Sequence, residues 1–312
     1  MTTDDDFTEE KQLAVRDGQG RVVVQVGLLA TLYFENAHRP ETRDAVLTCV
    51  ERLQACFGQH LRWVVHPKSG KMYPHGSSRV PSLRAVMAQR GGNQAWEYST
   101  HGGEQPEAAS HFRIEAFGPP DWEKALGHLS FMLPLTWFAD HPGSLPALML
   151  ELCNHLHPIH GYGGPGLAES PDVGVESDFQ PAVYAMARRF PGLEVDSPLS
   201  HARYLGDGIK GVNWLTIVGE RFLPRVGGIP GLVATLGDEI SLREYDGGVL
   251  IQAGSRPRMG DANDGRIPEP YLRVAQALRP LRVESVGSLH FAGGNRFTPE
   301  TSDEWLRRFD GP

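Results

Sequence analysis

The segment at residues 211–228 constrains the fold more than any other part of the chain. Residues 212–218 are mostly apolar, β-branched or aromatic, which predicts a strand that is buried on at least one face. Gly219 ends this run, and the residues after it favour a short helix with one apolar face. Gly227 and Gly228 then supply a stop, because a residue without Cβ enters the left-handed conformation cheaply at a helix end. The segment therefore predicts a core strand followed by a short helix, and it contains no nucleophile and base pair.

This segment resembles the signature of a known bacterial family. The order Trp-Leu-Thr-Ile-Val-Gly at residues 214–219, then a short amphipathic helix and Gly-Gly, is similar to the TsiV-like immunity proteins of type VI secretion systems, formerly a domain of unknown function. Residues 157–167, a Gly-rich turn after a helix, resemble the central region of that family. The resemblance spans about residues 22–286. It implies a stoichiometric inhibitor of a secreted toxin and not an enzyme, and toxins guarded in this way are often nucleases of the restriction-endonuclease superfamily.

Strands alternate loosely with helices along the chain. Residues 21–34 predict one long strand with a bulge at Gly27, and residues 40–57 a helix with Pro at its first turn. Residues 239–245 and 249–254 predict a hairpin around Asp-Gly. Further strands are expected at residues 61–65, 72–73, 96–99, 111–117, 129–138 and 281–286, and further helices at residues 81–89, 145–156, 180–189, 230–236, 270–278 and 299–309. This pattern favours an α+β fold, with mixed, largely antiparallel sheet packed with helices.

The domain organisation follows from length and charge. Residues 1–20 are expected to form a disordered acidic tail, because the first ten residues hold five acids and no base. Residues 21–312 are expected to form a single large α+β domain, either as one body or as two lobes at about 21–160 and 161–312. Residues 21–57 and 129–156 share the order of strand, short loop and helix, so we consider a structural duplication as a hypothesis.

Charge and cysteine usage narrow the functional class. The net charge of −8 argues against a generic nucleic-acid binder, because phosphate contacts need clustered Lys and Arg. Cys49, Cys56 and Cys153 lie in helical apolar patterns and fit small core residues of a reduced protein. No apolar run approaches the roughly 20 residues that span a bilayer, and the acidic N-terminus is unlike a secretory signal. We therefore expect a cytoplasmic protein that binds neither membrane nor nucleic acid directly.

Three histidines offer the main alternative function. His155, His157 and His160 could converge at a helix end and hold the zinc ion of a metal-dependent hydrolase. No acid or cysteine lies close enough in sequence to complete the ligand set, and His near a helix C-terminus is also favoured by the helix dipole. Residues 161–166 match GxGxxG, but they follow a helix and contain Pro165, which favours a tight turn over a nucleotide site. We therefore expect no metal and no cofactor. A scaffolding protein without a toxin is a third possibility.

Acidic residues supply the candidate contacts for a toxin. Residues 160–187 contain four carboxylates and neither Lys nor Arg, which predicts an acidic loop. That loop is either a solvated edge or a surface that occupies a basic groove. Residues 254–267 are a second candidate loop, with mixed charge. The candidate partner contacts are Glu169, Asp172, Glu176, Asp178, Asp261 and Asp264. An acidic partner would be steered quickly to a basic groove, so we expect the chain to bind its toxin and neutralise it by occlusion.

Overall fold

The computed structural model describes residues 13–141, 143–290 and 296–311, and it shows the predicted α+β fold. The strands are β1 (Ala14–Arg16), β2 (Val22–Phe34), β3 (Trp63–Val65), β4 (Met72–Pro74), β5 (Trp96–His101), β6 (Arg113–Gly118), β7 (Gly127–Leu133), β8 (His160–Glu169), β9 (Leu215–Gly219), β10 (Ile240–Tyr245) and β11 (Gly248–Ala253). The α-helices are α2 (Pro40–Phe57), α3 (Leu83–Gln89), α4 (Leu135–Asp140), α5 (Ser144–Leu156), α6 (Val173–Arg189), α7 (Pro198–His201), α8 (Gly228–Leu236), α9 (Glu269–Leu278) and α10 (Pro299–Leu306).

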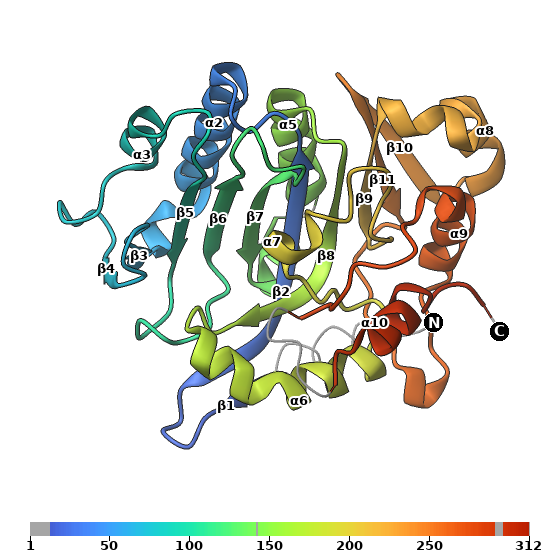
Figure 1. Cartoon of the computed structure of the whole chain (residues 1–312). Helices are drawn as coiled ribbons and strands as arrows, with labels where there is room; N and C mark the ends of the chain where they lie inside the picture. Colours follow the sequence, from blue (N-terminus) through green and yellow to red (C-terminus); the bar gives the residue numbers. More distant parts are fainter. Residues whose placement is uncertain (1–12, 142, 291–295, 312) are drawn as a thin grey trace.

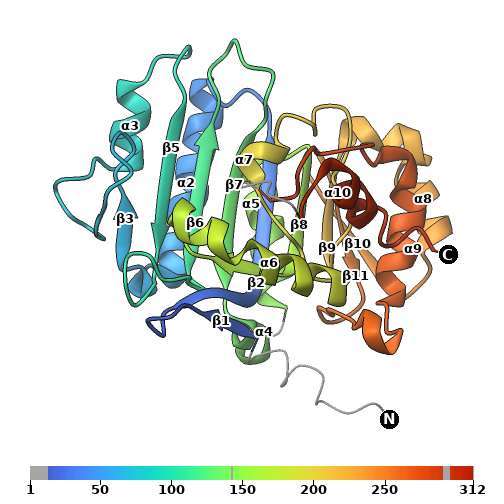
Figure 2. The same cartoon turned by 60° about the horizontal axis from the view of Figure 1, so that its bottom comes forward.

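All eleven strands belong to one sheet, in the order β10-β11-β9-β8-β2-β7-β6-β5-β3-β4, with β1 beside β2 (Figure 1). Every strand pairing within the described residues is antiparallel. Figure 2 shows α2 and α5 on one face of the sheet and α6, α7 and α10 on the other. The sheet is therefore the middle layer, and its central strands are covered on both faces.

The centre of the sheet is β2, which pairs with β7 on one side and with β8 on the other. From Val23 to Phe34 its side chains are buried, apart from the half-buried Gln25. The bulge expected at Gly27 is absent, because the register with β8 runs unbroken through this residue. A glycine is needed at this position for close packing instead. A Cβ on Gly27 would lie 2.9 Å from the carbonyl oxygen of Leu133.

The Gly-rich segment is a buried strand, β8, and not the tight turn expected from its sequence. It lies between β2 and β9, and all ten of its residues are buried. A Cβ on Gly163 would lie 2.6 Å from Sδ of Met149 on α5, and one on Gly166 would lie 2.6 Å from Cβ of Leu29 on β2. The glycines therefore allow close packing against both neighbours, a demand that no local pattern could reveal.

The prediction of an acidic loop after β8 is also wrong. The chain leaves β8 at Glu169 and enters α6 within four residues, so the helix begins at Val173 and not at residue 180. Asp172 is the N-cap, and its Oδ1 accepts hydrogen bonds from the backbone nitrogens of Gly174 (2.9 Å) and Val175 (3.1 Å). Pro181 lies inside the helix, where it removes one backbone donor. Gly174 and Pro181 disfavour a helix locally, and packing of α6 on the sheet overrides that preference.

Two other strands expected from the sequence differ from what the structure shows. Residues 129–138 divide at Pro134 into the end of β7 and the short helix α4. Residues 281–286 form no strand and contribute only one isolated bridge, Ile209 to Arg282.

The segment at residues 211–228 behaves as predicted. β9 begins directly after Trp214, which is completely buried, and the 3-10 helix η2 (Glu220–Val226) follows it. Gly227 adopts the left-handed conformation (φ 77°) at the end of η2, and α8 starts immediately afterwards. The hairpin of β10 and β11 is also confirmed, with Tyr245 opposite Gly248.

The predicted acidic tail overlaps a described element, because residues 14–16 form β1 and pair with β2. Its acidic residues Asp4, Asp5, Asp6, Glu9 and Glu10 lie outside the described residues. The two candidate lobes meet where β2 pairs with β8, within one continuous sheet. A duplication stays a hypothesis. None of the described helices is long and apolar enough to cross a bilayer.

Candidate partner-binding cleft

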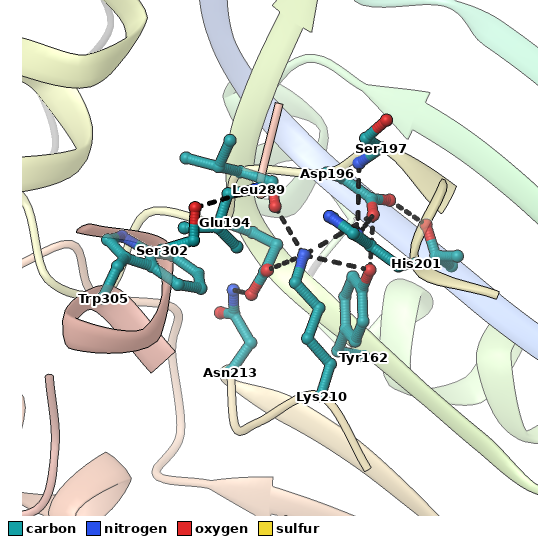
Figure 3. A network of polar contacts seen from close by, with 12 residues as sticks. Tyr162, Glu194, Asp196, Ser197, His201, Lys210, Asn213, Leu289, Ser302 and Trp305 are labelled. Atoms are coloured by element: carbon teal, nitrogen blue, oxygen red, sulfur yellow. Dashed lines mark hydrogen bonds and ion pairs between the residues drawn. The ribbon is translucent and has the colours of Figure 1, made fainter. Parts of the chain in front are cut away.

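A buried ionic network lies beside the face of the sheet that α6 and α7 cover (Figure 3). Lys210, from the segment before β9, has only 1% of its side chain exposed. Its Nζ lies 2.8 Å from Oε1 of Glu194 and 3.7 Å from Oδ1 of Asp196, and it donates a hydrogen bond to the carbonyl oxygen of Val195. One ammonium group therefore neutralises part of the charge of two carboxylates that follow α6.

Asp196 connects this network to the centre of the sheet. Its Oδ2 accepts a hydrogen bond of 2.5 Å from Oγ1 of Thr31, and its Oδ1 accepts one of 2.5 Å from Oη of Tyr162. Burial alone would raise the pKa of Asp196, but the charge of Lys210 and the hydrogen bonds together hold that pKa below its usual value. Burial and the nearby Asp196 charge raise the pKa of Tyr162 well above its usual value, so its hydroxyl stays a donor.

Glu194 connects the same network to the C-terminal residues. Its Oε2 accepts a hydrogen bond from Nδ2 of Asn213 (3.3 Å) and lies 3.6 Å from a guanidinium nitrogen of Arg308. The guanidinium of Arg308 also stacks on the ring of Trp305 in α10, 3.3 Å from the ring centroid. The network therefore holds the last helix against the sheet. Its ammonium is enclosed by protein groups, so we assign it a structural role.

Next to this network the molecule has a cleft of about 310 Å³. Its walls come from β5 and β6, from the start of α6, and from the segment that leads into α7. Figure 2 shows α6 crossing this face of the sheet. The carboxylates that line the cleft are Glu97, Glu115, Glu169, Glu176 and Asp196. Its apolar lining includes Tyr98, Phe117, Val173 and Leu199, and the last two are exposed to solvent.

Two glutamates of the cleft share one imidazole. Nε2 of His290 lies 2.8 Å from Oε2 of Glu169 and 3.6 Å from Oε1 of Glu176. Burial lowers the pKa of His290, but the hydrogen bond and charge of Glu169 outweigh this and raise it overall. Burial and the charge of Glu169 raise the pKa of Glu176 to about 7. These three side chains are the one group of potential metal ligands within 4.8 Å of one another in the described part of the chain.

A buried histidine with an unpaired nitrogen also lines the cleft. His128 on β7 is 4% exposed, and its Nδ1 has no hydrogen-bond partner among the described residues. Its ring stacks against Phe117, with the ring centroids 5.8 Å apart. Burial lowers the pKa of His128 to about 4, so the ring is neutral at pH 7.

The sequence-predicted contact residues fall into two places. Glu169, Asp172, Glu176 and Asp178 lie at or near the start of α6, where Glu169 and Glu176 line the cleft and Asp178 is exposed. Asp261 and Asp264 lie elsewhere, in the loop before α9. Asp261 is buried and paired with Arg189 at 2.8 Å, whereas Asp264 is exposed and pairs with Arg266 at 2.9 Å. The structure therefore brings together only the first group, and their contact with a partner stays a prediction.

The histidines of the alternative hydrolase do not form a common site. His155 and His157 are exposed at the end of α5, whereas His160 is buried in β8. Both ring nitrogens of His160 bond to the backbone: Nδ1 lies 3.1 Å from the carbonyl oxygen of Ile217, and Nε2 accepts from the nitrogen of Lys210 at 3.2 Å. Burial lowers the pKa of His160 to about 3. Its role is to connect β8 to β9 and Lys210.

A family model described as type VI immunity for VRR-NUC matches residues 45–309, which is most of the chain. The chain belongs to the TsiV family. The match includes the whole cleft and, apart from Thr31, the residues named in the buried network, and it extends beyond residue 286 into α10. TsiV is a family of type VI secretion immunity proteins, as the resemblance at residues 214–219 implied.

A solved structure supports the same assignment. The Pseudomonas aeruginosa T6SS protein PA0821 superimposes with a TM-score of 0.87 and 26% sequence identity, over 95% of this chain and 87% of that one. No curated protein sequence matches the chain. The TsiV assignment therefore rests on the family match, and the structural likeness to a T6SS protein agrees with it.

Proposed function

We propose that this TsiV-family chain binds a cognate nuclease effector of the VRR-NUC type in the cytoplasm and neutralises it by occlusion. The observation that carries the proposal is the family match over residues 45–309, whose description names VRR-NUC as what the family gives immunity against. A nuclease must hold the phosphates of DNA, which requires a groove of basic side chains. A protein that covers such a groove is favoured when its own surface is acidic.

The distribution of charge supports this mode of action. The chain carries a net charge of −8, and five carboxylates line the cleft beside α6. Of the residues that line it, Glu97 is exposed and Val173 is 54% exposed, so the cleft offers both charged and apolar contact area. Long-range attraction of this kind acts chiefly on the association rate and is screened over about 8–10 Å at physiological salt.

Neutralisation by binding needs no reaction on the side of the immunity protein. In the buried network Lys210 pairs with Glu194, and Tyr162 donates a hydrogen bond to Asp196. Both ring nitrogens of His160 form hydrogen bonds with backbone groups. We therefore infer that the chain neutralises the effector by binding it, and not through a reaction at the buried network. The cytoplasm is the compartment where such an effector would reach DNA.

Co-expression tests the proposal. The expected result is that bacteria producing a VRR-NUC effector encoded beside the gene for this chain grow only when the chain is also present, and that the two proteins co-elute as one complex. Association should slow as salt is raised from 50 to 300 mM, by roughly an order of magnitude. Growth arrest despite a well-expressed, folded chain would refute the proposal.

A further inference from the structure

We propose that the acidic cleft beside α6 is a guanidinium-binding site, which receives an arginine side chain of the effector. The inference rests on the proposed function for the source of the arginine, but the site itself is defined by the free chain. Three features carry it: an incomplete balance of charge, an unpaired buried nitrogen, and aromatic and apolar walls.

The charge balance is incomplete at Glu176. Glu115 has Arg113 at 3.6 Å, and Asp196 has Lys210 at 3.7 Å. Glu169 and Glu176 both pair with His290, which lies closer to Glu169 by 0.8 Å (3.6 Å against 2.8 Å), and the charge of Arg113 acts on Glu176 only from beyond 4.0 Å. No cation other than His290 lies within 4.0 Å of Glu176 in the described part of the chain. A half-buried carboxylate without its own counter-ion is stabilised by a cation that docks from solvent.

His128, in the wall of the cleft, has a buried ring nitrogen without a hydrogen-bond partner among the described residues. Buried polar atoms are almost always hydrogen-bonded, so the unpaired Nδ1 of a residue only 4% exposed requires an explanation. The ring is neutral, so one of its nitrogens is an acceptor. A guanidinium has five N–H donors in a rigid plane, and it can donate to an imidazole while it pairs with a carboxylate.

The walls favour arginine over lysine. The rings of Phe117 and Tyr98 line the cleft, and a planar guanidinium stacks on aromatic faces whereas a strongly hydrated ammonium does so less well. Val173 and Leu199 lie on its exposed rim, where they can cover the methylene stem of a long side chain. Buried arginine anchors of this kind are common at the centres of protein interfaces.

The first test uses the free chain and small probes. Amide NMR spectra are recorded during titration with Nα-acetylarginine methylamide, and separately with the citrulline analogue, which has the same shape and no charge. Shifts at the start of α6 and in β6 with the arginine probe, at least about tenfold weaker with citrulline, are the expected result. Equal shifts with both probes, or no shifts in these elements, would overturn the proposal.

The second test separates the cleft from the general acidity of α6. Glu176→Gln should weaken binding of the arginine probe and of the effector by at least about tenfold each. Asp178→Asn, an exposed change on the same helix, should leave binding of the arginine probe within about twofold. Glu97→Gln at the exposed edge of the cleft replaces Glu176→Gln if that variant does not fold. Wild-type affinity of the cleft variant for the effector overturns the proposal. Failure of the wild-type chain to neutralise the effector would instead refute the proposed function, and the probe titration would still decide whether the site exists.

Discussion

The Nζ of Lys210 lies 2.8 Å from Oε1 of Glu194, and neither side chain has more than 4% of its surface exposed. Lys210 is one of five lysines in a chain of 312 residues, and the pair joins the segment before β9 to the segment after α6. Desolvation makes such a pair costly, so its presence alone says little about net stability. Removing only the lysine has a different effect, because it leaves the carboxylate of Glu194 buried without its counter-ion.

We therefore predict that Lys210→Met lowers the free energy of unfolding by about 3–5 kcal/mol, measured by urea denaturation. The matched control is Arg273→Met, which breaks the exposed pair with Glu269 on α9 and should cost less than about 0.5 kcal/mol. A loss below about 1 kcal/mol in Lys210→Met would show that the pair does not hold these segments together.

The core strand gives a second prediction. Trp214 is completely buried, and its Nε1 donates a hydrogen bond to the carbonyl oxygen of Gly254 at 3.0 Å. Trp214→Ala should cost about 3–5 kcal/mol of unfolding free energy, because a large cavity opens in the core. Trp122→Ala is the control, since that ring is 73% exposed and its loss should change stability by about 0.5 kcal/mol or less. Equal melting temperatures for the two variants would contradict the assigned packing.

A third prediction concerns the close packing of β8. An added Cβ on Gly166 would meet Cβ of Leu29, an atom that cannot move without its backbone, so Gly166→Ala should destabilise the fold by about 1–3 kcal/mol. Gly206→Ala is matched in chemistry, but nothing lies within 4 Å of the new Cβ. The melting temperatures of the two variants should therefore differ by several degrees. Coincident transitions would favour the turn that the sequence suggested.

The buried histidines predict how stability depends on pH. Burial lowers the pKa of His160 to about 3, whereas an unfolded histidine titrates near 6.5. Below about pH 6.5 the unfolded chain therefore binds a proton that the folded chain excludes, and the free energy of unfolding falls as pH falls. Glu176, with a pKa raised to about 7, acts in the opposite direction between about pH 4.5 and 7.

Because each excluded proton contributes about 1.4 kcal/mol per pH unit, His160→Asn should reduce the slope of unfolding free energy against pH by about that amount between pH 6 and 4.5. Urea titrations at several pH values measure this slope. An unchanged slope in a folded variant would mean that His160 titrates normally. His157→Asn, at an exposed position, serves as the control.

The part of the fold that could be predicted is the part that local patterns determine. The order of strand, short helix and left-handed Gly227 depends on neighbours within a few residues, so the sequence alone predicts it. The role of the glycines in β8 depends instead on how closely Leu29 and Met149 approach, and those residues lie on other elements. Their positions become known only when the sheet is assembled.

The candidate site divides in the same way. A run of carboxylates without Lys or Arg predicted an acidic loop, but most of that run forms α6, and Glu169 at its start is buried. His290 pairs with Glu169, and His128 lines the cleft. They lie 121 and 41 residues from Glu169, and no spacing rule connects them. The scarcity of lysine was the one sequence signal that could have marked Lys210, which stands among apolar residues and glycines.

The central claim is that the chain neutralises a nuclease by occupying it, and a DNA-cleavage titration tests this most directly. A fixed amount of purified VRR-NUC effector is mixed with increasing amounts of the chain, and the loss of intact plasmid is measured. If binding is tight, cleavage should fall linearly and reach background at about one equivalent. The same titration with Glu176→Gln should need a several-fold excess. Undiminished cleavage in a large excess of folded wild-type chain would contradict the account.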